Sequence, residues 1–179
     1  MTQLVGAESS GRTTLAYAVV EAVTAAGEYA AWVDFPDAFD AKHANTAGIC
    51  LSRLLWVRPR ELWDALRATE LVLETGGFAV VLVDLADERV SSRSVSPAAW
   101  LRLARAAARS RSAVLTIGVL RSAGMFATLC LETERSQARF TGSNGPCPLF
   151  EGITGVVRLR KNKLGPPGPI AARFLGTCI

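Results

Sequence analysis

The chain has 179 residues, half of them hydrophobic, and a formal net charge of +4. This length and composition suit one domain with a substantial core, which excludes wholesale disorder. The sequence shows no signal-peptide pattern and no apolar run of the roughly 20 residues that a membrane-spanning helix needs. The four cysteines lie far apart in the sequence, and the chain has a single histidine. This argues against a metal centre and for a reduced cytoplasm.

The first motif lies between residues 6 and 14 and reads GAESSGRTT. Its spacing is that of a phosphate-binding P-loop, G-x-x-x-x-G-K-[ST], except that Arg12 stands at the lysine position. The glycines allow backbone N–H groups to converge on phosphate oxygens at a helix N-terminus. The candidate ATP and magnesium site comprises Gly6, Glu8, Ser9, Ser10, Gly11, Arg12, Thr13, Thr14 and, further along the chain, Asp84. Because arginine is longer than lysine and planar, two interpretations stay open: a loop that binds nucleotide, and a relic loop retained for packing.

The elements around this loop follow in order. A strand over 2–5 precedes it, and a helix over about 13–26, patterned by Leu15, Val19 and Val23, follows it and ends at Gly27. The next elements are a strand over 29–33 that ends at Asp34, a short helix over 37–48 and a short strand over 54–57. After Pro59 comes an amphipathic helix that turns Leu62, Leu66 and Leu73 inward and stops at Gly76-Gly77.

A continuous apolar run over 78–83 predicts a strand buried on both faces, and 113–119 is the next expected buried strand. Ser96 and Pro97 begin the helix between them. This alternation predicts a mainly parallel α/β sheet flanked by helices. Beyond residue 126 the pattern changes to strand-like pieces over 126–132, 153–161 and 170–175, interrupted by turn-rich 141–148. We therefore expect one domain over 1–179 whose C-terminal third is antiparallel β and extends the same sheet.

Arginine clusters in the middle of the chain. The helix that begins at Ser96 carries Leu101, Ala104 and Ala108 on one face and Arg102, Arg105 and Arg109 on another. With Arg93 and Arg121, these arginines are a candidate surface for DNA phosphates or a protein partner. The alternative is a solvated helix face, and the mild positive charge of the chain is compatible with both.

Four blocks in order, GAESSGRTTL, WVDFPDAFDAKHANTAG, VVLVDL and LRKNKLGPP, resemble the RecA-type ATPase core over nearly the whole chain. The chain is short and is most similar to the small RecA-like proteins of the ImuA type. The resemblance implies a cytoplasmic, nucleoid-associated role in mutagenic translesion synthesis after DNA damage, within the SOS response. The implied partners are an ImuB-type inactive relative of Y-family polymerases and an error-prone replicative-type polymerase, with RecA as a further candidate.

Compared residue by residue, the resemblance is weakest at the positions that hold the catalytic residues of the family. Asp84 matches the magnesium-organising aspartate of the family, but Pro36 stands at the position of the catalytic glutamate and Val119 at that of the γ-phosphate-sensing glutamine. We therefore assign no catalytic residue, unless Asp37 replaces the missing base. His43 stands at the position of the adenine-stacking aromatic, whereas Lys161 and Lys163 match the paired lysines that reach a neighbour's nucleotide in recombinase filaments.

The DNA-binding loops of recombinases correspond here to two short stretches, 87–94 and 122–124. A filament that stretches DNA is therefore not expected, and any DNA binding must come from surface charge. The favoured function is a non-catalytic RecA-like accessory that binds partners and DNA; the alternative is a weak ATPase whose nucleotide state switches that binding. Because the chain begins directly at its first strand, we expect either a core trimmed at its ends or a minimal core.

Overall fold

The computed structural model describes residues 1–87, 90–91, 93–141, 149–165 and 171–177. Their strands form one eight-stranded sheet in the order β3-β2-β4-β5-β1-β6-β7-β8. The strands are β1 Thr2–Gly6, β2 Ala30–Asp34, β3 Leu54–Val57, β4 Val80–Asp84, β5 Ala113–Gly118, β6 Leu129–Thr141, β7 Leu149–Asn162 and β8 Ala171–Thr177. Pairing is parallel from β3 to β6 and antiparallel from β6 to β8. The predicted fold class is thus confirmed, with β2, β4 and β5 in the interior of the sheet.

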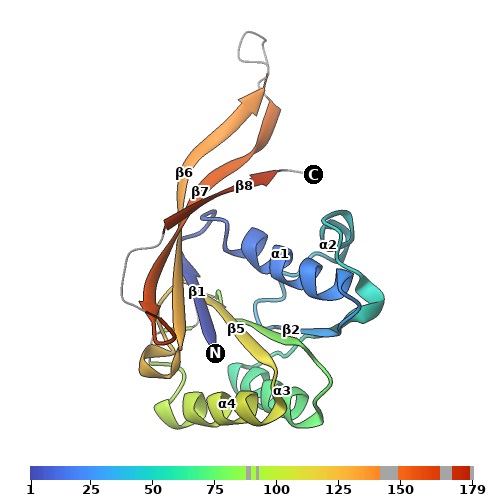
Figure 1. Cartoon of the computed structure of the whole chain (residues 1–179), viewed down its shortest axis with the longest axis vertical. Coiled ribbons are helices and arrows are strands. Elements are labelled where there is room, and N and C mark those ends of the chain that lie inside the picture. The colour runs from blue at the N-terminus through green and yellow to red at the C-terminus, as the bar shows by residue number, and fades with distance from the viewer. Residues whose placement is uncertain (88–89, 92, 142–148, 166–170, 178–179) are drawn as a thin grey trace.

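In the described part of the chain, four α-helices cover the two faces of this sheet. They are α1 Arg12–Ala25, α2 Ala41–Thr46, α3 Leu62–Thr75 and α4 Pro97–Ser110, and two short 3₁₀ helices lie at Leu51–Arg53 and Gly124–Phe126. Figure 1 shows α1 and α2 on one face and α3 and α4 on the other. Within the described ranges, no helix is long and apolar enough to cross a membrane.

The two faces of the central strands build two separate cores. On β2 and β4, Trp32 and Leu82 pack with α1, whereas Val33 and Val83 pack with α3 and α4. All five residues of each of these strands are buried. This double burial explains why the two strands are continuously apolar in the sequence instead of alternating.

The helices bury faces that the sequence predicts only in part. On α3, Leu66 and Leu73 are buried as predicted. On α4, the buried face consists of Ala99, Trp100, Leu103, Ala106 and Ala107, whereas Leu101 and Ala108, from the apolar face expected there, are exposed. On α1, the buried stripe is Ala16, Tyr17, Val20 and Thr24, and Val19 of the expected pattern is exposed. Alanine-rich stripes allow close helix–sheet contact and are hard to distinguish in composition from the neighbouring faces.

The helix expected over 37–48 is shorter, because side-chain oxygens take up the backbone donors that precede it. The Asp34 carboxylate accepts hydrogen bonds from the backbone N–H groups of Ala38 and Phe39, both at 3.0 Å. Asp40 then caps α2 by accepting from Lys42 and His43. The helix therefore begins at Ala41.

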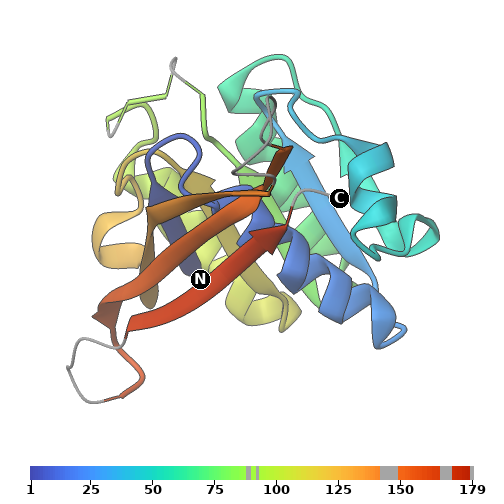
Figure 2. The same cartoon turned by 90° about the horizontal axis from the view of Figure 1, so that it is seen from above.

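The C-terminal strands are longer than predicted. The first begins at Leu129 and runs to Thr141, three residues later and nine residues further than the expected 126–132. Beyond the helices, β6 and β7 continue as a projecting two-stranded ribbon (Figure 1). Seen from above, β6, β7 and β8 lie side by side as the twisted end of the sheet (Figure 2). Most of the expected turn over 141–148 lies outside the described residues.

Candidate functional site

The loop between β1 and α1 keeps the tight backbone that the P-loop spacing predicts. Ser9 and Gly11 both adopt left-handed conformations, with φ of 55° and 89°, and the Ser10 N–H donates to the Ala7 carbonyl at 3.2 Å. A Cβ on Gly6 would lie 2.5 Å from Ser10 Oγ and 2.6 Å from the Thr133 carbonyl oxygen. The first glycine is therefore required by close packing, and the last by backbone conformation.

A residue of β6 anchors this loop. The hydroxyls of Ser10 and Thr133 are hydrogen-bonded at 2.8 Å, and Thr133 Oγ1 also donates to the Val5 carbonyl at 3.2 Å. Both side chains are buried. The sequence contains no signal for Thr133, because its role depends on β6 pairing beside β1. The loop is thus held from the side of the sheet that the C-terminal strands extend.

Arg12, the first residue of α1, is half-buried. Exposed side chains around it are those of Glu8, Ser9, Thr13 and Thr14. The Arg12 Nη1 atom is buried and has no hydrogen-bond partner among the described residues. Burial lowers the pKa of Arg12, while the negative charges of Asp84 and Glu8 act in the opposite direction. A buried guanidinium nitrogen without an acceptor fits a phosphate oxygen, so this part of the site suits an anion.

Asp34 and Asp84 lie side by side at the carboxyl ends of β2 and β4. Asp34 is fully buried and accepts from the Trp56 indole at 3.1 Å in addition to its two backbone donors. Asp84 is 6% exposed and accepts from the Ala86 N–H at 2.9 Å. Burial, with a smaller contribution from the charge of Asp34, raises the pKa of Asp84 to about 6, although Arg12 opposes the rise. Asp84 is therefore protonated below about pH 6 and carries its negative charge at neutral pH.

The positions that would activate water carry no free base. Pro36 is half-buried and Val119 is exposed just beyond β5. Asp37, the expected substitute, accepts from Arg58 Nε at 2.6 Å and from Arg58 Nη2 at 2.8 Å. These hydrogen bonds lower the pKa of Asp37 and make it a poorer base. Exposed His43 lies against Tyr17, with ring centroids 5.6 Å apart in a tilted arrangement.

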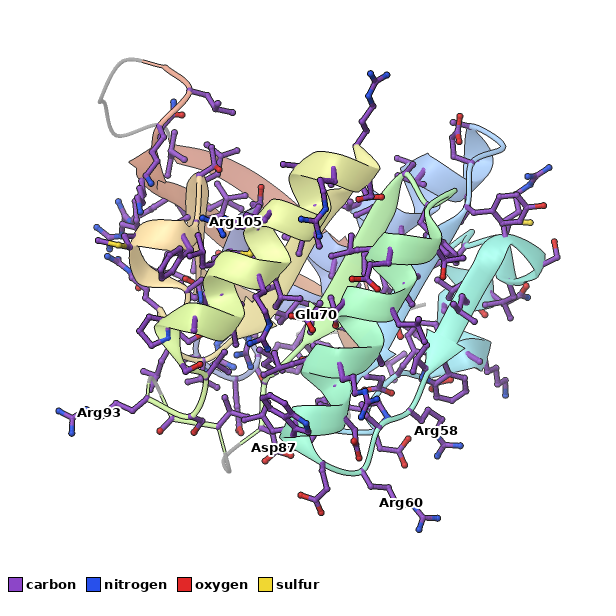
Figure 3. The ribbon with its side chains drawn as sticks, turned by 90° about the horizontal axis from the view of Figure 1, so that it is seen from below. Arg58, Arg60, Glu70, Asp87, Arg93 and Arg105 are labelled. Carbon is purple, nitrogen blue, oxygen red and sulfur yellow. The ribbon has the colours of Figure 1, made fainter. Side chains whose placement is uncertain are left out.

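The predicted arginine surface divides into paired and unpaired members. Arg102 Nε donates to Glu70 Oε1 at 2.6 Å, and its guanidinium lies 5.8 Å from the centre of the Trp63 ring. Arg121 donates to Glu132 at 3.1 Å. In the part of the chain that the structure describes, Arg93, Arg105 and Arg109 are exposed and form no ion pair. Figure 3 shows α3 and α4 side by side, with Arg105 on α4 and Arg93 projecting outward at the left edge of the view.

The two lysines that match the filament motif contact their own chain. Lys161 Nζ donates to the Gly124 carbonyl at 2.8 Å, and Lys163 Nζ donates to the Met125 carbonyl at 2.6 Å. The short segment between β5 and β6, the counterpart of the second recombinase loop, is thus tied to β7 and to the residue that follows it. The counterpart of the first recombinase loop spans 87–94, and the structure does not describe its residues 88–89 and 92.

The loop therefore keeps a buried guanidinium nitrogen of Arg12 without an acceptor among the described residues, whereas Asp37, the expected substitute base, is bonded to Arg58. Within the described ranges, no group of three His, Cys, Asp or Glu side chains could hold a metal ion. The described cysteines, Cys50 and Cys130, are free thiols. Sequence reasoning singles out the loop and Asp84 as candidates, but it does not single out Asp34, Thr133 or the carboxylates that pair with the arginines.

Comparison with solved structures supports the fold. The crystal structure of SulA from Pseudomonas aeruginosa superimposes with a TM-score of 0.53 at 18% identity, covering 66% of this chain and 98% of that one. At this identity the similarity concerns the fold alone.

Sequence comparison identifies the family. Protein RecA of Rippkaea orientalis is 26% identical over 94% of this chain, and Protein RecA 1 of Myxococcus xanthus is 28% identical over 92%. Protein RecA of Caulobacter vibrioides is 40% identical over 46% of the chain. The chain spans about half the length of the first two relatives, 56% of each, and the shorter alignment covers 23% of the Caulobacter protein. Residues 1–97 match the RecA N-terminal domain, and the chain belongs to that family.

Proposed function

We propose that this protein is a catalytically degenerate RecA-like accessory of DNA repair that acts in damage-induced mutagenic translesion synthesis by binding partners and DNA. The observation that carries the proposal is the state of its ATPase centre. The loop keeps its backbone, but Pro36 and Val119 stand where the resemblance places the catalytic glutamate and the γ-phosphate-sensing glutamine, and Asp37 is bonded to Arg58. Phosphoryl transfer depends on positioned charge and an oriented nucleophile, and this site supplies little of either.

A second candidate function is a nucleotide-switched binder, favoured by the buried Arg12 Nη1 that lacks an acceptor. If ATP and magnesium bind, Gly6, Gly11 and Arg12 would hold the phosphates, and Thr13 and Asp84 would face the metal. A thermal-shift titration with ATP, with and without magnesium, separates the two candidates. The accessory predicts no magnesium-dependent rise in melting temperature, whereas a switch predicts a rise that Arg12→Ala abolishes and Thr75→Ala, on the far end of α3, leaves intact.

For DNA, the unpaired arginines are the better candidates. Arg105 and Arg109 lie exposed on α4 without a carboxylate partner among the described residues, whereas Arg102 is engaged with Glu70. Clustered guanidinium groups contact phosphate with little sequence preference. A double charge reversal of Arg105 and Arg109 should weaken binding to single-stranded DNA, and the matched control Arg60→Glu, an exposed arginine at the foot of α3 (Figure 3), should not.

The protein partners proposed are the ImuB-type polymerase relative, an error-prone replicative-type polymerase and RecA. Acting with them would place the protein in the cytoplasm at the nucleoid. The direct test is co-purification of the tagged chain with each partner, expressed separately so that indirect capture is excluded. Capture of the ImuB-type protein alone, unaffected by Arg12→Ala, supports a non-catalytic accessory. Failure to capture any of the three contradicts the proposal.

A further inference from the structure

A hollow of about 380 Å³ lies between the start of α4 and the segment that joins β5 to β6. One wall consists of Arg93, Val95, Pro97 and Trp100, and the other consists of residues 122–126. The size is at the lower end of the range for ligand pockets, which are mostly apolar with a few polar groups that fix orientation. The composition of this hollow follows the same pattern.

The second wall is held in place from outside the hollow. The ammonium groups of Lys161 and Lys163 bind the carbonyls of Gly124 and Met125, and the Phe126 N–H donates to the Ala123 carbonyl at 2.9 Å. Ala123 is fully buried, whereas Met125 is 71% exposed at the rim. The wall is therefore preformed, and it presents a large apolar side chain to solvent.

The described lining of the hollow carries positive charge. Among the described residues, it contains one charged side chain, Arg93, and no carboxylate. Pro97 is the first residue of α4, whose first turn carries no acidic residue, so the positive end of the helix dipole also faces this region. The ammonium groups of Lys161 and Lys163 lie behind the segment 124–126. A ligand with negative charge is complementary to such a rim.

Trp100 provides an independent indication of a ligand. Its side chain is 2% exposed and lines the hollow, and its indole N–H has no acceptor among the described residues. A buried indole usually finds a hydrogen-bond partner, because leaving the donor unpaired costs free energy. The Trp32 indole also lacks an acceptor, but Trp32 lies inside the core between β2 and α1. Of these two tryptophans, Trp100 is the one that lines the hollow.

We propose that this hollow binds an acidic, apolar peptide segment of a protein partner. An apolar side chain of the peptide fills the space beside Trp100 and Met125, and a neighbouring carboxylate pairs with Arg93. This site is separate from the phosphate-binding loop and from Arg105 and Arg109, the arginines proposed to contact DNA. Of the arginine surface that the sequence suggests, Arg93 is the member that lines the hollow and serves the protein partner.

The test follows the Trp100 indole resonance by NMR in the full chain labelled with ¹⁵N-tryptophan. Trp100→Phe assigns the resonance among the four tryptophans. The probes are the peptide acetyl-Asp-Asp-Leu-Phe-Asp-amide, the same peptide with lysine in place of aspartate, and a ten-nucleotide oligothymidylate. We expect the acidic peptide to shift the resonance saturably and the basic peptide to leave it unchanged. The proposal is wrong if the acidic peptide causes no saturable shift, if both peptides shift the resonance equally, or if only the oligothymidylate does.

Charge reversals then locate the site. Arg93→Glu should weaken binding of the acidic peptide by about tenfold or more, the effect of losing one charge-assisted contact, and Met125→Glu should weaken it similarly. Arg105→Glu, the matched control, should leave peptide binding unchanged even where it weakens DNA binding. This pairing separates the two proposals, because failure of DNA binding leaves the peptide result intact. Equal losses in Arg93→Glu and Arg105→Glu would show nonspecific attraction and overturn the assignment.

Discussion

Replacing Asp84 with asparagine should stabilise the protein at neutral pH. The carboxyl group is buried beside Asp34, and its pKa is raised to about 6 mainly by that burial. Asparagine has nearly the same shape and keeps an oxygen that can accept from the Ala86 N–H, now at 2.9 Å from Asp84. The substitution therefore removes a buried negative charge without opening a cavity or leaving that donor unpaired.

The magnitude follows from linkage. An unfolded chain releases the Asp84 proton near the ordinary pKa of 3.8, whereas the folded chain holds it to about 6. Between these values the folded state binds more protons, so raising the pH lowers the free energy of unfolding of the wild type. At 1.36 kcal/mol for each pH unit, the loss amounts to about 3 kcal/mol. The advantage of Asp84→Asn should therefore be absent near pH 4, develop up to about pH 6 and stay level above it.

Urea denaturation of both proteins at pH 4, 5, 6, 7 and 8, without nucleotide or magnesium, measures this difference. Asp64→Asn, at an exposed position in the first turn of α3, is the matched control and should show no such growth with pH. A difference between Asp84→Asn and wild type that does not change with pH would refute the reasoning. A variant less stable than wild type at pH 8 would show that the Asp84 charge is compensated in the fold.

Three further predictions concern the loop and the DNA surface. Gly6→Ala should destabilise the fold by about 1–3 kcal/mol through overpacking, because the added Cβ would meet Ser10 and Thr133. The control Ala7→Ser, at an exposed position, should leave the free energy of unfolding unchanged in the same urea titration. Arg12→Lys should leave ATP turnover below about 1 s⁻¹, the low end for ordinary enzymes, because the water-activating base is still missing. A faster magnesium-dependent rate in a phosphate-release assay would contradict this prediction. DNA affinity should fall with salt, with a log–log slope of roughly −0.7 to −0.9 per phosphate contacted, and should not change with ATP; an ATP requirement in an anisotropy titration would favour the switch instead.

The parts of the fold that the sequence predicts well are those in which local pattern and burial agree. The run that ends at Asp84 is apolar at every position because both of its faces are covered, and Ser96-Pro97 places the start of α4 by capping chemistry alone. Both patterns involve only a few adjacent residues, so they can be recognised without knowledge of the tertiary structure.

The long β6–β7 ribbon is predicted poorly for the opposite reason. Past Glu134, most β6 residues are exposed on a strand that no helix covers. Without a buried face there is no alternation to detect in the sequence. Pairing with β7 through twelve registered positions extends this strand, and such pairing is a property of two distant segments together.

The arginine surface shows the same limit at the level of the site. Arg102 and Arg105 are equivalent in the helical pattern, yet one is bound to Glu70 and the other has no ion-pair partner among the described residues. Glu70 lies thirty-two positions from Arg102, so only the packing of α3 against α4 decides which arginine is neutralised. Sequence can count the charges on a helix face, but it cannot say which are available to a ligand.

The side chains that an ATPase would direct at its ligand mostly form hydrogen bonds within this chain instead. Asp34 accepts from two backbone N–H groups and an indole, Asp37 is bonded to Arg58, and the paired lysines hold carbonyls of their own chain. Contacts of this kind stabilise the fold and must be broken before the same atoms can serve a nucleotide or a neighbour. Arg12 Nη1 is the exception at the loop, as the Trp100 indole is at the hollow. Binding is therefore best sought where donors still lack acceptors, and the two sites call for different ligands: a phosphate at the first and an acidic peptide at the second.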